Sequence, residues 1–165
     1  MEGHKMNMDN NQKLNQKDLK IIAHLRNDAR MPLTKMSKKV QIPVSTIFDR
    51  LKANENKLII KHTSLLDFSR LGYHTRANIA VKVNKEHKEE LKNYLVTHQN
   101  TNSVYKINNG FDFMIEGIFT HIKDMEEFID ELENKFNIED KKFFFIIEDL
   151  KKEAFMSNPD MLWGN

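Results

Sequence analysis

The sequence predicts an α+β protein made of an N-terminal three-helix domain, of the winged or helix-turn-helix type, and a C-terminal ferredoxin-like βαββαβ domain. Residues 14–54 carry apolar side chains at helical spacing. Residues 77–147 alternate between strand-like and helix-like patterns. The charges are also divided between the two parts. Through residue 76 there are 15 basic against 7 acidic residues, and from residue 77 onward there are 11 against 17.

The division of charge predicts that the two parts have different partners. The first part has a net charge of +8 and the second a net charge of −6, which the total of +2 conceals. A basic part is typical of a protein that meets a polyanion. The chain has no cysteine, which excludes disulfides, a thiol nucleophile and a cysteine zinc site.

The sequence gives no sign of a membrane or an export segment. The longest apolar run, Phe143–Ile147, is far shorter than a membrane-spanning helix requires. Residues 1–13 are polar and lack the apolar region of a secretory signal. We therefore expect a cytoplasmic protein with a disordered N-terminal tail and no membrane partner.

Three helices are expected in the basic part. Asn15 is a favourable N-cap for the first helix, and Asp18 follows at the capping-box position. Pro43 ends the second helix pattern, because proline disfavours a helical conformation in the residue before it. A third helix is expected over about Val44–Asn54. Two short helices joined by a tight turn and supported by a first helix are typical of a helix-turn-helix motif.

In such a motif the second helix of the pair enters the major groove of DNA. Side chains on its outward face are candidates for base contacts, and lysines on the preceding helix suit phosphates. Arg50 can bond a guanine, and Asp49 can accept from a cytosine. The alternative is a three-helix bundle with ordinary solvated lysines. The candidate DNA-binding residues are Lys35, Lys38, Lys39, Ser45, Thr46, Asp49 and Arg50.

The acidic part predicts strands at residues 77–83, 104–107, 111–119 and 143–147, with helices starting at Asn84 and Asp124. Asn109-Gly110 is expected to form a primed hairpin turn, because both residues tolerate positive φ. The resulting order, βαββαβ, is that of the ferredoxin-like split motif.

The last predicted strand is apolar on both of its faces. Phe143, Phe145 and Ile147 alternate with Phe144 and Ile146. Two helices cover only one side of such a sheet, so the other side needs a cover. A second copy of the chain is the simplest cover, which predicts a homodimer. The alternative is an exposed patch closed by the C-terminal tail.

Taken together, these segments resemble the Lrp/AsnC family of leucine-responsive, or feast/famine, transcription regulators. The resemblance covers about Leu14–Phe155. It rests on the order and spacing of several short motifs, which are Lys38-Lys39-Val40-x-Ile42, Ser45-x-Ile47-x-x-Arg50-Leu51, Leu65-Leu66-Asp67-x-x-x-Leu71-Gly72, Phe111-Asp112-Phe113-Met114-Ile115 and Ile146-Ile147-Glu148-Asp149-Leu150-Lys151.

The resemblance implies a sequence-specific regulator that binds double-stranded DNA and forms a dimer, which can assemble further into a tetramer or an octamer. It also implies a small effector, such as an amino acid, near Asn109, Gly110 and Asp112. The amides of a tight turn can hold a carboxylate, and Asp112 can hold an ammonium group. The alternative is that Asp112 only caps its own turn. No cofactor is implied.

Four positions depart from the family pattern, namely Asn109, Pro43, Asn54 and Lys57. Asn109 stands two residues before the aromatic residue of the effector signature, where the family usually has glycine. Asparagine tolerates the left-handed conformation, but it adds a polar side chain to the expected pocket. Pro43 replaces the usual serine cap of the third helix, which removes a side-chain acceptor there.

Two other functions fit the same scaffold. Some Lrp/AsnC-like proteins decarboxylate sirohaem-type tetrapyrroles, but such an enzyme has less need of the basic residues found here. A DNA-architectural protein without an effector is the third possibility. We identify no catalytic residues. We also expect no metal site, because the seven histidines are scattered and no His-Glu-x-x-His motif is present.

The expected organisation along the chain follows from these patterns. It consists of a disordered tail (1–13), a helix-turn-helix domain (14–60), a hinge strand or linker (61–76), an effector and dimerisation domain (77–155) and a C-terminal tail (156–165).

Overall fold

The computed structural model describes residues 15–55 and 57–161, so the expected tail at residues 1–13 lies outside the described residues. The chain divides into two compact units. The helical unit takes residues up to Ser64 together with the segment from Lys151 onward, and the α+β unit comprises Leu65–Leu150. No helix in the described ranges is long and apolar enough to cross a bilayer.

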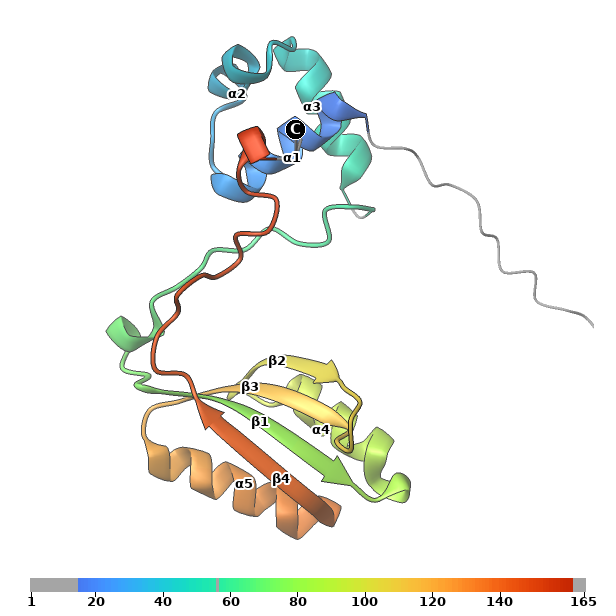
Figure 1. Cartoon of the computed structure of the whole chain (residues 1–165), viewed down its shortest axis with the longest axis vertical. Helices are drawn as coiled ribbons and strands as arrows, with labels where there is room; N and C mark the ends of the chain where they lie inside the picture. Colours follow the sequence, from blue (N-terminus) through green and yellow to red (C-terminus); the bar gives the residue numbers. More distant parts are fainter. Residues whose placement is uncertain (1–14, 56, 162–165) are drawn as a thin grey trace, which may run out of the picture. The chain divides into compact units, whose positions relative to one another are not determined.

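The helical unit contains α1 (Gln16–Asn27), α2 (Leu33–Val40) and α3 (Val44–Asn54), all shown in Figure 1. The predicted capping box at the start of α1 is confirmed. The amide of Asp18 donates to Oδ1 of Asn15 over 2.9 Å, and the amide of Asn15 donates back to Asp18. The bounds of α3 are those expected from the sequence, and its start has no side-chain cap.

A tight turn between α2 and α3 sets the helix-turn-helix geometry. Gln41 takes the left-handed conformation, with φ of 55°, at the end of α2. The hydroxyl of Ser37 donates to the carbonyl of Ile42 over 2.6 Å and holds the turn against the helix. The turn lets the helices share one core, formed by Ile21, Met31, Met36, Val40, Ile42 and Ile47 with partly buried Leu33 and Leu51.

The described residues between α3 and the sheet form little regular structure. They contain no hairpin wing, because only an isolated bridge joins Glu55 to Ile59. The segment expected at residues 61–76 to be a hinge strand or a linker holds the 3₁₀ helix η1 (Phe68–Leu71), and β1 begins only at Thr75. Asp67 caps this helix by accepting from the amide of Ser69, and Gly72 ends it with φ of 90°.

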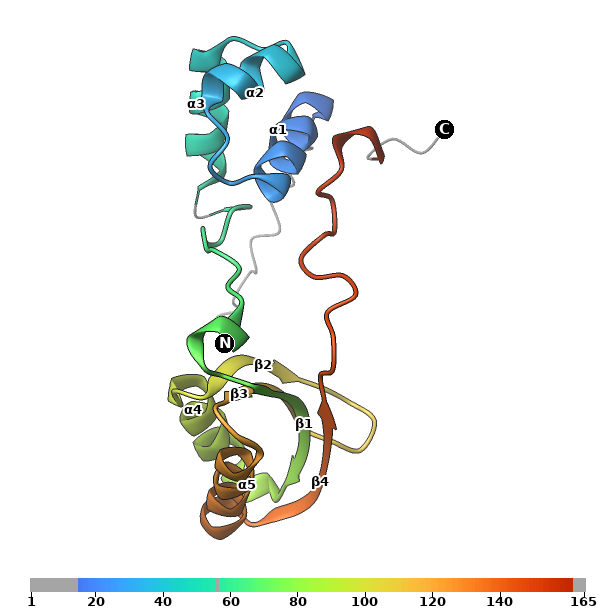
Figure 2. The same ribbon diagram turned by 90° about the vertical axis from the view of Figure 1, so that its left-hand side faces the viewer.

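The α+β unit has the predicted βαββαβ order. Its elements are β1 (Thr75–Val83), η2 (Lys85–His87), α4 (Lys88–Thr97), β2 (Thr101–Lys106), β3 (Phe113–Phe119), α5 (Ile122–Phe136) and β4 (Ile138–Phe145). The four strands form an antiparallel sheet in the order β2-β3-β1-β4. Both α-helices lie on one face of this sheet (Figure 2).

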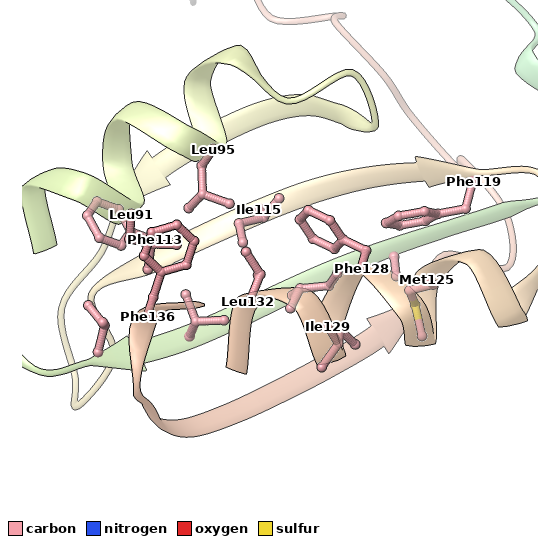
Figure 3. Packing of buried hydrophobic residues seen from close by; sticks show 14 residues of the cluster. Leu91, Leu95, Phe113, Ile115, Phe119, Met125, Phe128, Ile129, Leu132 and Phe136 are labelled. Carbon is pink, nitrogen blue, oxygen red and sulfur yellow. The ribbon is translucent and has the colours of Figure 1, made fainter. Parts of the chain in front are cut away.

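The core of this unit lies between the sheet and the two helices (Figure 3). Alternate residues of β1 point inward, which explains the alternation in the sequence. Burial of each large apolar side chain contributes roughly 1.5–3 kcal/mol. The predicted inward stripe of α5 is confirmed, and its buried members are Met125, Phe128, Ile129, Leu132 and Phe136.

Several element boundaries were predicted wrongly, including those of β2, which begins at Thr101 rather than at residue 104, and of β3, which begins at Phe113 rather than at residue 111. The last strand covers Ile138–Phe145 rather than 143–147, because an edge strand tolerates the charged residues that hid its beginning. The second helix starts at Ile122 rather than at Asp124, which instead stands at the third helical position and accepts from the amide of the N-cap His121.

The segment after residue 150 belongs to the helical unit, not to the α+β domain or to a free tail. The guanidinium group of Arg26 in α1 donates to the carbonyl of Phe155 over 3.1 Å and to the carbonyl of Glu153 over 3.0 Å. It also meets the carboxylate of Glu153 at 3.3 Å. These contacts depend on residues more than 120 positions apart, so local patterns could not reveal them.

Candidate DNA-binding surface and ligand sites

One face of α3 is turned inward and the opposite face is exposed. Ile47 is fully buried against the other two helices, which fixes the rotation of α3 about its axis. The exposed side carries Ser45, Phe48, Asp49 and Lys52, which we call the α3 stripe. Two of these residues, Phe48 and Lys52, were missed by the sequence reasoning. Their spacing of three and seven residues from Ser45 was the signal that places them on the same face.

Arg50 does not lie on the α3 stripe. Its guanidinium group forms an ion pair with Asp18, at the start of α1, and donates to Asn15 over 3.2 Å. The side chain of Arg50 is 29% exposed. The structure thus brings Arg50 to the α1 side of α3, whereas the sequence grouped it with the base-contacting candidates. Thr46, one turn earlier on that helix, is half-buried.

The three candidate lysines of α2 are all exposed. Lys35 lies in the first half of the helix, and Lys38 and Lys39 lie in its last turn. Within the described part of the chain, none of the three has a carboxylate at ion-pair distance. Exposed and unpaired ammonium groups are the form of lysine that neutralises phosphates.

The hairpin turn of the α+β unit has the predicted backbone. Asn109 and Gly110 both have positive φ, of 63° and 90°. A left-handed asparagine therefore stands where the family commonly has glycine. Asp112 follows the turn, and its amide donates to the carbonyl of Val81 over 2.9 Å.

The carboxylate of Asp112 is engaged with two other elements. One oxygen accepts from the amide of Val83 over 3.0 Å, and the other meets the ammonium group of Lys88 at 2.6 Å. Burial alone raises the pKa of Asp112, but the contacts with Lys88 and Val83 outweigh it and lower the pKa below its ordinary value. Lys88 was not singled out from the sequence, because only the fold brings α4 to this turn.

The sheet face away from the helices is partly apolar. In register, Phe144 stands opposite Asn78 on this face, and Tyr105 stands opposite Met114. The side chains of Phe144 and Tyr105 are each 57% exposed. Phe143 stands opposite the buried Ile79, so it lies on the helix-covered side. The expected alternation of the two faces along the last strand is therefore confirmed for these residues.

The described residues offer no cluster of side chains that could hold a metal ion. The surface that remains is a helix with an exposed polar and aromatic stripe beside free lysines, together with a separate α+β unit. This arrangement suits recognition of DNA by the helical unit, and comparisons with known proteins agree.

The chain matches the AsnC-type helix-turn-helix domain over residues 14–53. The HTH-type transcriptional regulator FL11 of Pyrococcus horikoshii is 31% identical over 118 residues, which cover 71% of this chain and 78% of that relative. The regulator LrpC of Bacillus subtilis is 27% identical over 118 residues, which cover 71% of this chain and 82% of LrpC.

Solved structures share the fold. The structure of Bacillus subtilis LrpC matches with a TM-score of 0.75 and 24% identity, covering 84% of this chain and 98% of that one. A transcriptional regulator from Neisseria meningitidis, solved as a complex with L-methionine, matches with a TM-score of 0.78 and 20% identity. That match covers 84% of this chain and 93% of the Neisseria chain.

Proposed function

Because the chain belongs to the Lrp/AsnC family of transcription regulators, we propose that the α3 stripe contacts base edges in the major groove and that the α2 lysines contact phosphates. The observation that carries this proposal is an exposed recognition-helix face beside three unpaired lysines. The protein is a DNA-binding regulator and not an enzyme, like the relatives that it matches. We also propose that it acts in the cytoplasm, with the DNA that it regulates.

Three members of the α3 stripe have a defined chemical role in this proposal. The carboxylate of Asp49 accepts from the amino group of a cytosine, and Phe48 packs against the methyl group of a thymine. Ser45 bonds either a base edge or a phosphate. Arg50 positions α3 through its ion pair with Asp18, instead of contacting a base.

Selection of bound duplexes from a random pool will supply the operator. We expect a near-palindrome whose half-sites lie one helical turn, or a multiple of it, apart. Fluorescence anisotropy then compares operators changed one base pair at a time. Phe48→Ala and Asp49→Ala should each relax the preference at one position, at a cost of about 1–3 kcal/mol, whereas Asp130→Asn in the other unit should change nothing. Equal affinity for the operator and a scrambled duplex would refute the proposal.

We further propose that the sheet face carrying Phe144 and Tyr105 joins two copies of the chain. Large exposed aromatic side chains on an uncovered sheet are typical of an interface. A twofold protein also agrees with binding to a near-palindromic operator. Tetramers and octamers are larger assemblies built from this dimer.

We propose that an amino acid is the effector and that it binds at the Asn109-Gly110 turn beside Asp112. The Lys88–Asp112 ion pair presents one positive and one negative group, at 2.6 Å from each other. A zwitterion carries the complementary pair of charges, so its ammonium group can take Asp112 while its carboxylate takes Lys88 and the turn amides. The Neisseria relative was solved with L-methionine, also a zwitterion.

Thermal shift against the twenty amino acids tests this effector site. A ligand present at 100 times its dissociation constant stabilises the folded state by about 2.7 kcal/mol. Asp112→Ala and Lys88→Met should each abolish the shift and leave DNA binding by the dimer intact. The matched control is Lys92→Met, which removes an ammonium group one turn further along α4. If no amino acid raises the melting temperature or changes the assembly, the protein is a regulator without such an effector.

A further inference from the structure

A cleft of about 650 Å³ opens in the α+β unit, away from the Asn109-Gly110 turn. The turn follows the end of β2, whereas the cleft lies where β2 begins and β3 ends, which is the opposite end of these two strands. Its walls come from the segment around η1, the loop between α4 and β2, and the part of α5 from Asp124 to Glu131. A volume of several hundred Å³ is in the range of small-molecule sites.

The charged groups that line the cleft are acidic. Asp124, Glu127 and Glu131 stand on one face of α5, at spacings of three and four residues, and no lysine or arginine is among the lining residues. Glu131 is paired with Lys135, and Glu127 lies 3.5 Å from Lys123.

Asp124 is the strongest anchor for a cation in this cleft. It has no cationic partner among the described residues, and one of its oxygens accepts from the amide of His121 over 3.0 Å. His98 also lines the cleft, where burial lowers its pKa more than the nearby carboxylate of Glu131 raises it, so the imidazole is mainly neutral near pH 7. The cleft therefore attracts cations and repels anions.

The rest of the wall is suited to an apolar body. Phe68 and Tyr73 line the cleft from the linker side, and the nearly buried Phe128 lines it from α5. Aromatic walls with a few polar groups are typical of small-molecule sites, and aromatic faces also attract cations.

We propose that this cleft binds an organic amine that has an apolar body and no carboxylate, with its ammonium group at Asp124 and Glu127. An amino acid fits poorly, because its own carboxylate would face the acidic wall. The site differs from the amino-acid site proposed above and does not depend on it. A bound amine contacts Phe68 and Tyr73, so it stabilises the segment that continues into the linker to the DNA-binding unit.

Calorimetry on the full chain carrying Asp112→Ala, in which the proposed amino-acid site is disabled, tests the class of ligand with three compounds that share a phenyl group. 2-Phenylethylamine carries only an ammonium group, L-phenylalanine adds a carboxylate, and 3-phenylpropionate carries only the carboxylate. We expect 2-phenylethylamine to bind at least tenfold more tightly than the other two. Absence of binding by the amine up to millimolar concentration, or equal binding of all three compounds, overturns the proposal.

Matched variants locate the site. Asp124→Asn keeps the acceptor for the His121 amide but removes the charge, and should weaken 2-phenylethylamine roughly fivefold. Glu127→Gln should weaken it less, because Glu127 is exposed. Two control variants remove one negative charge outside the cleft. Asp130→Asn removes it from α5, and Asp112→Asn removes it at the Asn109-Gly110 turn. Affinity lost equally in all four variants would show general charge attraction and refute the cleft as the site.

Protection of the linker supplies a second readout. The side chain of Arg70 in η1 is 86% exposed, so trypsin can cleave after it. Contacts between the amine and this segment reduce local opening, so cleavage after Arg70 should slow in saturating 2-phenylethylamine. Mass spectrometry measures the rate of cleavage after Arg70. The rates of cleavage at sites in the helical unit serve as an internal reference. If the rate of cleavage after Arg70 is the same with and without saturating 2-phenylethylamine, the proposed contact between the amine and the linker is wrong.

Discussion

The two units use lysine in different ways. In the α+β unit, six lysines lie 3.5 Å or less from a carboxylate, namely Lys82, Lys88, Lys92, Lys123, Lys135 and Lys141. In the helical unit, Lys35, Lys38, Lys39 and Lys52 have no carboxylate partner among the described residues. The same side chain therefore stabilises local structure in one unit and remains available to a polyanion in the other.

Net charge alone does not show whether a lysine is already paired with a carboxylate. The excess of acidic residues in the second part of the chain supplies partners for its lysines, and the ion pairs are mostly within or beside α4 and α5. The first part lacks enough carboxylates to do the same. Availability of a charge, rather than its presence, decides whether it can neutralise a phosphate.

The largest expected effect concerns self-association, which we propose for the α+β unit. Phe144→Asp places an unpaired charge in the proposed interface and should cost the dimer roughly 3–5 kcal/mol. Analytical ultracentrifugation measures the change. Val96→Asp is the matched control, because Val96 is 67% exposed on α4. If both variants sediment like the unchanged chain, the interface lies elsewhere.

The next effect separates free lysines from paired ones. Replacing Lys35, Lys38 and Lys39 with alanine should lower the slope of log affinity against log salt by about three, because each lost phosphate contact removes about one unit. Replacing Lys92, Lys123 and Lys135 changes the net charge equally but removes paired lysines. Titrations of operator DNA at several salt concentrations compare the two triple variants. Equal slopes would contradict the distinction between free and paired lysines.

A smaller effect is expected when Arg50 is replaced, because this cation of the helical unit is paired with Asp18. A double-mutant cycle with Asp18, read by hydrogen exchange of α1 and α3 amides, should give a coupling energy of about 1 kcal/mol. In DNA binding, Arg50→Ala should weaken all sequences alike. A loss confined to one base position would instead make Arg50 a base-contacting residue.

The smallest effect is the pH dependence due to Asp112. Its folded pKa is lowered, so the unfolded state binds more protons at acid pH, and stability is lost as the pH falls through that pKa. Thermal unfolding from pH 7 to pH 3 should therefore show a flatter acid limb for Asp112→Asn, by less than about 1 kcal/mol. An acid limb identical to that of the unchanged chain would place the carboxylate outside this network.

Sequence patterns predicted those features that depend on neighbouring residues. The bounds of α3 and the positive φ at Asn109 and Gly110 follow from local preferences. The position of Arg50 does not, because its partner Asp18 is 32 residues away and meets it only after α1 packs on α3. The Lys88–Asp112 pair likewise requires α4 to lie beside the hairpin turn.

The hydrogen bonds between Arg26 and the segment after residue 150 affect the order in which parts of the chain fold during synthesis. The core of the three helices needs no residue beyond Leu51, so α1, α2 and α3 can pack while most of the chain is still unmade. The carbonyl groups of Glu153 and Phe155 reach Arg26 only after the α+β unit has left the ribosome. The DNA-binding unit is therefore the first to begin folding and the last to be completed.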